Sequence, residues 1–194
     1  SGRTLFGWRV CFGVGLMLLG TTAHAADGRW SSAGPYGGRV DSAVLGTGEP
    51  GVVYASAHRS VYRSADGGLN WTLAAAGLST VTSGESVIVA HPTLTRHLAL
   101  AGARGVFLTQ DAGRSWLRRD SGLPVGNSGF RTVDIAFAPS SPQRMYLASE
   151  DDGLYRSLDG GLNWSATATN SLPSDLDRVA VDPLNPLRVL AWAR

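Results

Sequence analysis

Aspartate recurs in this 194-residue chain within one short pattern, Ser/Thr-x-Asp-x-Gly-x-x-Trp, which occurs three times. Short Asp, Ser and Thr side chains hydrogen-bond the backbone N–H groups of a turn. The glycine suits the left-handed position of a tight hairpin, and the tryptophan can cover the turn with an apolar ring. Every residue type therefore serves a turn, and none requires a substrate. The three copies comprise Ser64, Asp66, Gly68 and Trp71; Thr109, Asp111, Gly113 and Trp116; and Ser157, Asp159, Gly161 and Trp164.

The spacing of these copies predicts the elements that position them. Trp71 and Trp116 are 45 residues apart, and Trp116 and Trp164 are 48 apart, which is the length of one propeller blade. Between the copies lies a second repeated unit, two apolar alternating segments joined by a Pro-rich turn, which predicts two further strands. We expect an all-β chain, a β-propeller of four-stranded antiparallel blades. The alanines that keep the same period in this unit are taken as equivalent positions: Ala55, Ala101, Ala148 and Ala191.

With these motifs the chain resembles the Asp-box (bacterial neuraminidase repeat) propellers. These include sialidases, xyloglucanase-type hydrolases, sortilin-like domains and photosystem II assembly factors. The resemblance covers roughly residues 36–194, and the segment 30–39 resembles the start of bacterial repeat proteins likened to photosystem assembly factors. It implies that the Asp box is a structural turn between the two outer strands of a blade, remote from the binding face.

The repeat predicts a lead-in at 26–38, blades at 39–85, 86–131 and 132–177, and an incomplete blade at 178–194. The fourth box would lie beyond Arg194, so about three and a half blades of a ring of roughly six to eight are expected. The alternative is a complete short protein that closes its ring by forming oligomers.

The first 25 residues are typical of an export signal. Arg3 and Arg9 precede the apolar run 10–20, and Ala23-His24-Ala25 fits a cleavage site. We therefore expect a mature chain from Ala26, periplasmic or secreted, with no stable membrane anchor, since a span needs ~20 apolar residues. The single cysteine falls in this segment, so the mature chain has no disulfide and no thiol nucleophile.

Charge argues against nucleic acid as a partner. All 17 basic residues are arginine, and the mature region balances 15 of them against 15 acidic residues. It contains no basic block interleaved with aromatic residues.

No cofactor or metal is expected either. Gly46–Gly51 matches G-x-G-x-x-G but leads into the apolar segment 52–55 rather than into a helix. His91 and His97 flank a Pro turn without a third ligand nearby, so a role in a surface turn is favoured over a metal site.

If the strand order follows the resemblance, candidate ligand-binding residues lie at the end of the blades opposite the boxes. Three arginines stand at the entry to innermost strands and could together bind a carboxylate or phosphate. Alternatively they bond exposed strand ends and solvent. The candidate residues are Arg39, His58, Arg59, Arg104, Arg131, Asp151, Asp152, Asp175 and Arg178.

The sequence lacks the early-blade signature of both hydrolase families that it resembles. The resemblance to sialidases implies an Arg-Ile-Pro context for the first arginine, whereas Arg39 lies in Gly-Gly-Arg-Val. The xyloglucanase-type loop would carry an Asp where residues 56–59 have no carboxylate. We therefore expect a non-catalytic binding or assembly module for a protein or carbohydrate. The alternative is a glycoside hydrolase whose catalytic residues lie partly outside this sequence. It could recruit Asp151 or Asp152 with Asp175 or Asp177 as its two carboxylates.

Overall fold

The computed structural model describes residues 39–57, 60–78, 85–103, 105–124, 131–150, 152–167 and 175–193. The expected signal peptide at 1–25 and lead-in at 26–38 lie outside the described residues. So do four of the candidate ligand-binding residues, which are His58, Arg59, Arg104 and Asp151.

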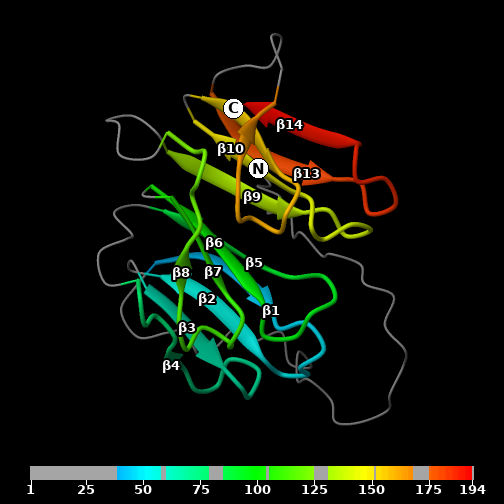
Figure 1. Ribbon diagram of the computed structural model, residues 1–194. Coiled ribbons are helices and arrows are strands. Elements are labelled where there is room, and N and C mark those ends of the chain that lie inside the picture. Colours follow the sequence, from blue (N-terminus) through cyan, green and yellow to red (C-terminus); the bar gives the residue numbers. More distant parts are fainter. Residues whose placement is uncertain are drawn as a thin grey trace, which may run out of the picture. The chain divides into compact units, whose positions relative to one another are not determined.

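Three successive repeats each form one antiparallel four-stranded sheet with its strands in chain order, and a two-stranded sheet follows (Figure 1). The predicted fold class, an all-β propeller of four-stranded blades, is confirmed. The last sheet begins at Leu176, two residues before the predicted start of the fourth blade. The strands are β1 (Val40–Leu45), β2 (Val53–Ala57), β3 (Ser60–Ser64) and β4 (Thr72–Leu73) in the first blade; β5 (Ser86–Ala90), β6 (Leu98–Gly102), β7 (Gly105–Thr109) and β8 (Leu117–Arg118) in the second; β9 (Thr132–Phe137), β10 (Met145–Ser149), β11 (Gly153–Ser157) and β12 (Ser165–Ala166) in the third; and β13 (Leu176–Val181) and β14 (Val189–Ala193) in the fourth.

Strand register gives every blade two distinct ends. In the first blade Leu45 pairs with Val53, which pairs with Ser64 of the Asp box, so one end carries the box. We call this the box end. At the other end Val40 pairs with Ala57, which pairs with Ser60. We call it the loop end, and it carries the starts of the first strands.

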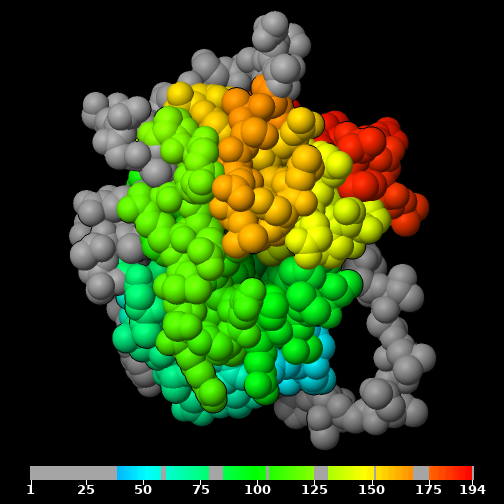
Figure 2. Space-filling view, in the orientation of Figure 1, coloured from blue at the N-terminus to red at the C-terminus, as the bar shows by residue number. Residues whose placement is uncertain are grey.

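The core is divided into three apolar clusters, one at each contact between neighbouring blades. Side chains alternate across a strand, so β6 serves two clusters: Leu98 and Leu100 face the first blade, while Ala99 and Ala101 face the third. The innermost strands β1, β5, β9 and β13 contact one another in succession. The second blade, in green, and the third, in yellow to orange, meet directly in the space-filling view (Figure 2).

Two of the three box tryptophans join neighbouring blades through their indole N–H groups. The indole Nε1–H of Trp116 donates to the carbonyl of Ala74 at 2.8 Å, and that of Trp164 donates to the carbonyl of Arg119 at 2.9 Å. In each case the acceptor belongs to the preceding blade. Trp71 instead donates to Gly68 in its own turn. Trp71 and Trp116 lie over their own turns, since a Cβ added to Gly68 or to Gly113 would lie 3.6 Å or 3.4 Å from their rings. Trp116 and Trp164 in addition dock onto the blade before them.

The pairing of β2 with β3 corrects one predicted equivalence. Counted back from the box along the ladder, Ser56 pairs with Val61 as Ala101 pairs with Val106. Ser56, not Ala55, is thus the structural equivalent of Ala101. The loops between the second and third strands have the same length in the first two blades. The spacing of 45 residues between the boxes therefore also holds along these strands, and Ala55 and Ala101, 46 residues apart, are one residue out of register. A slip of one residue moves a side chain to the opposite face of the sheet.

Candidate functional site

The Asp box is a closed set of hydrogen bonds at the box end. In the third blade the Ser157 hydroxyl donates to Asp159 Oδ1 at 2.7 Å and accepts from the N–H of Gly161 at 2.8 Å. Asp159 Oδ1 also accepts from the N–H of Asn163 at 2.9 Å, and Oδ2 accepts from its Nδ2 at 2.8 Å. The first two boxes repeat this arrangement, Asp66 with Asn70 and Asp111 with Ser115.

These bonds keep the three carboxylates ionised. The backbone N–H of Asn70 is the main reason that the pKa of Asp66 falls to about 2. The hydroxyl of Ser115 and the side-chain amide of Asn163 have the same effect on Asp111 and Asp159, whose pKa values also fall to about 2. A carboxylate that accepts several hydrogen bonds in its charged form is a poor proton donor or acceptor near neutral pH. The box geometry is that of a turn.

Each box also holds the first hairpin of its own blade. The residue after the aspartate has a positive φ, and its N–H donates to a carbonyl in the turn between the first two strands. In the second blade this residue is Ala112, with φ of 65°, and its N–H lies 3.0 Å from the carbonyl oxygen of Arg96. Gly67 and Gly160 donate in the same way to Gly51 at 2.8 Å and to Gln143 at 2.7 Å. The box therefore joins two turns of one blade.

A cleft of about 540 Å³ lies at the box end, where the second and third blades meet. Its walls carry leucines, aromatic rings and polar side chains, including Leu94, Leu108, Leu162, His91, His97 and Phe137. The rings of His91 and His97 are 5.9 Å apart. Among the described residues, no three His, Cys, Asp or Glu side chains gather as metal ligands would.

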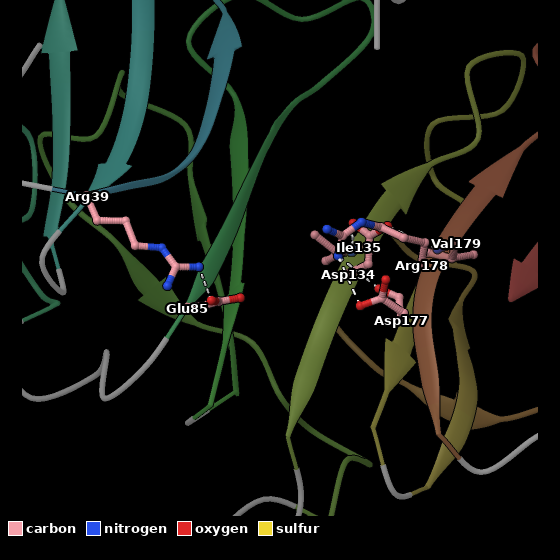
Figure 3. A network of polar contacts seen from close by, with 7 residues as sticks. All are labelled: Arg39, Glu85, Asp134, Ile135, Asp177, Arg178 and Val179. Carbon is pink, nitrogen blue, oxygen red and sulfur yellow. Dashed lines mark hydrogen bonds and ion pairs between the residues drawn. The ribbon is translucent and has the colours of Figure 1, made fainter. Parts of the chain in front are cut away.

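At the loop end, the residue that precedes the first strand of each blade is charged and exposed, and its sign alternates. These residues are Arg39, Glu85, Arg131 and Asp175. Arg39 forms an ion pair with Glu85 of the second blade (Figure 3). Arg131 pairs with Glu150 of its own blade at 2.7 Å. The loop end therefore presents a row of charges of both signs.

Arg178 lies within β13 rather than before it, and its guanidinium is 3.6 Å from the carboxylate of Asp177. The three candidate arginines thus have separate carboxylate partners and come from three different blades. Asp152 precedes β11 of the third blade, and its N–H donates to the Ser149 hydroxyl at 3.3 Å. Asp175 precedes β13 of the fourth.

Asp134 is a buried carboxylate that the sequence analysis did not single out. It is 4% exposed, on the innermost strand β9. Its Oδ1 accepts from the N–H of Ile135, and its Oδ2 accepts from the N–H of Val179 on β13, both at 3.0 Å (Figure 3). A single carboxylate within the otherwise uncharged strand β9 (Thr132–Phe137) is the signal that could have revealed it. Its hydrogen bonds join the third blade to the fourth.

No helix within the described ranges has the length and apolar character needed to cross a membrane. Sequence comparison yields no relationship: no protein-family model and no curated protein matches the chain.

Successive four-stranded antiparallel sheets that contact one another along their innermost strands define a β-propeller. Solved structures share this fold. The chain is similar to an ancestral GH74 enzyme (TM-score 0.61, 20% identity), over 75% of this chain and 21% of that one. The GH74 enzyme of Niastella koreensis aligns with TM-score 0.59 and 19% identity, over 73% and 24%. YCF48 from Cyanidioschyzon merolae aligns with TM-score 0.56 and 16% identity, over 79% and 53%. The chain thus spans between a fifth and about half of these proteins.

Proposed function

We propose that the chain is a non-catalytic β-propeller module, exported from the cell, that acts as a binding or assembly scaffold. The partner, a protein segment or a carbohydrate, binds at the loop end of the blades. The observation that supports this proposal is the charged row at that end. Its arginines are half-exposed and held beside carboxylates instead of being buried in a core.

Such pairs suit reversible binding. The side chains of Arg39, Arg131 and Arg178 are 72%, 56% and 42% exposed. An exposed ion pair contributes only ~0–1 kcal/mol to stability, so a ligand carboxylate can take the place of the present partner at small cost. A guanidinium offers five donors in a planar fork, which matches carboxylates and the hydroxyl groups of sugars.

The competing function is glycoside hydrolysis, and the fold shared with GH74 enzymes is compatible with it. That reaction needs two carboxylates facing across a cleft, ~5–10 Å apart. Glu85, Glu150 and Asp177 are paired with arginines, which favours binding over catalysis. Asp152 and Asp175 are the described carboxylates to test for catalysis.

The binding proposal can be tested with a glycan array and a displayed random-peptide library as probes, using the 194-residue chain. We expect ligands to be retained and their binding to fall at least tenfold when Arg39, Arg131 and Arg178 are all changed to Glu. The matched control is Arg114→Glu, an exposed arginine within the second Asp box. Equal losses in the two variants would place binding elsewhere.

Hydrolysis is tested separately with xyloglucan oligosaccharides and fluorogenic sialosides. We expect no turnover by the purified chain. Turnover that disappears in Asp152→Asn or Asp175→Asn would establish the hydrolase instead.

Export is tested by the mass of the mature protein, which should correspond to cleavage after Ala25; an intact N-terminus would refute it.

A further inference from the structure

The first hairpin of each blade contains two positions whose side-chain sizes compensate for each other. The first position follows the innermost strand, and its N–H bonds back across the turn; it is Gly46, His91 and Ala138 in the three complete blades. The second position pairs with the residue just before the box Ser or Thr; it is Tyr54, Ala99 and Tyr146. Two blades therefore combine a small residue with a tyrosine, whereas the second blade combines histidine with alanine.

In the first blade the two positions are close in space. A Cβ added to Gly46 would lie 3.4 Å from the ring of Tyr54, which is fully buried. In the second blade the tyrosine is replaced by Ala99, and the imidazole of His91, 8% exposed, supplies the ring at this contact. The contact between the second and third blades thus contains a titratable ring where the neighbouring contacts have tyrosine.

His91 connects parts of three blades. Its ring lies 5.1 Å from that of Phe137, the last residue of β9 in the third blade. Its carbonyl accepts a hydrogen bond of 2.7 Å from the hydroxyl of Thr47 in the first blade. Phe137 in turn packs against the apolar cluster that contains Trp164. A change at His91 therefore reaches the docking of the third blade.

The ring also caps its own turn. His91 Nδ1 accepts hydrogen bonds from the N–H groups of Thr93 at 3.2 Å and Leu94 at 3.0 Å. At the equivalent place in the fourth blade, Asp182 Oδ1 accepts from the residues two and three positions later, Leu184 and Asn185. His91 Nδ1 thus accepts the turn hydrogen bonds that a carboxylate oxygen accepts in the fourth blade. Only the form of the imidazole with a free lone pair on Nδ1 can accept them.

The surroundings disfavour a positive charge on His91. Burial, followed by the neighbouring His97, lowers the pKa of His91 below its ordinary value. Phe137 brings no charge from β9. The remaining charged groups that line the cleft are Asp111, Arg119 and Asp159, and both carboxylates already accept hydrogen bonds within their boxes. On the same turn Arg96 pairs with Glu49 of the first blade at 3.1 Å.

We propose that His91 makes the contact between the second and third blades acid-sensitive. A proton on Nδ1 removes the acceptor of two backbone N–H groups and places a cation beside His97 and Phe137, so the turn opens and the third blade loosens from the second. Because the unfolded chain takes up this proton first, the stabilisation is complete above pH ~6.5 and is lost as the pH falls. Burial raises the pKa of Tyr54, which fills the contact between the first and second blades, so this phenol stays neutral over the same range.

Hydrogen exchange of the tryptophan indole N–H groups, followed by NMR, tests the proposal. The Trp164 indole bonds across the affected contact, and the Trp116 indole bonds across the contact between the first and second blades, which serves as an internal reference. Between pH 7.5 and 5.5 we expect the protection factor of Trp164 to fall at least tenfold while that of Trp116 stays within twofold. A parallel fall at both positions, or at neither, would overturn the proposal.

Two variants assign the effect to His91. His91→Ala combined with Ala99→Tyr rebuilds the arrangement of the third blade and should make the protection of Trp164 independent of pH over this range. His91→Asn keeps a neutral acceptor and should do the same if the double variant fails to fold. The control His97→Gln should keep the acid response. A folded variant without His91 that still loosens in acid would refute the proposal.

Discussion

The two ends of the blades are built on opposite principles. At the box end the same atoms form the same hydrogen bonds three times, in Asp66, Asp111 and Asp159. At the loop end the equivalent residues before the first strands differ in kind and alternate in sign. A fold is stabilised when every repeat makes the same hydrogen bonds and leaves few polar groups unbonded. A binding surface instead needs side chains that differ from one repeat to the next. The difference supports the proposal that the box end serves stability and the loop end contacts the ligand.

The largest effect should come from Gly122, where the outer strand of the second blade meets the box of the third. A Cβ at this position, with φ of 86°, would lie 2.1 Å from the carbonyl oxygen of Trp164. Gly122→Ala should therefore lower the free energy of unfolding by about 3–5 kcal/mol, measured by urea denaturation.

The matched control is Gly153→Ala at the loop end, where φ is 78° and no atom lies within 4 Å of the added Cβ. It should cost only the left-handed backbone, about 1–2 kcal/mol. Equal costs for the two substitutions would show that the contact between the blades adds nothing to the cost at Gly122.

A smaller effect is expected from the box carboxylate itself. Asp159→Ala leaves the turn N–H and the Asn163 amide without their acceptor, which should cost about 1–3 kcal/mol. The exposed loop-end residue Asp175, changed to Ala, should stay within about 0.5 kcal/mol of the parent chain. Thermal unfolding of the two variants compares them, and a larger loss at Asp175 would reverse the assignment of the two ends.

The smallest effect is the acid response of the boxes. Their aspartates have pKa values lowered to about 2 in the folded chain. The stabilisation is therefore complete above the ordinary pKa of aspartate, near 4, and is lost as the pH falls towards 2. Urea denaturation between pH 4.5 and 2 should show a shallower decline for Asp159→Asn than for the parent. An identical decline would show that protonation of Asp159 does not contribute to the loss of stability in acid.

The sequence predicted the box because each part of it lies within eight residues, so local chemistry decides the geometry. The docking of the box was not predictable in the same way. Trp116 finds its acceptor 42 residues earlier, at Ala74, and no local pattern announces a carbonyl in another blade. The positive φ of Ala112 was also missed, because alanine rarely adopts it.

In the candidate site, too, local features were predictable from the sequence and long-range contacts were not. The arginines at the strand entries were visible as a repeated residue type, but their partners were not, because Glu85 lies 46 residues from Arg39. Asp134 was overlooked because an apolar strand was read as core throughout. The equivalence of Ala55 with Ala101 failed because these residues are 46 apart whereas the boxes of the same blades are 45 apart, and a recurring alanine does not reveal a shift of one residue in the ladder.

One ligand titration tests most directly whether the box end serves stability and the loop end binds the ligand. It is performed below the melting temperature of every variant. A ligand retained by the parent chain is titrated into Asp159→Ala and into Arg131→Glu. We expect unchanged affinity for the box variant and at least tenfold weaker binding for the loop-end variant. Affinity lost in folded Asp159→Ala and kept in Arg131→Glu would contradict it.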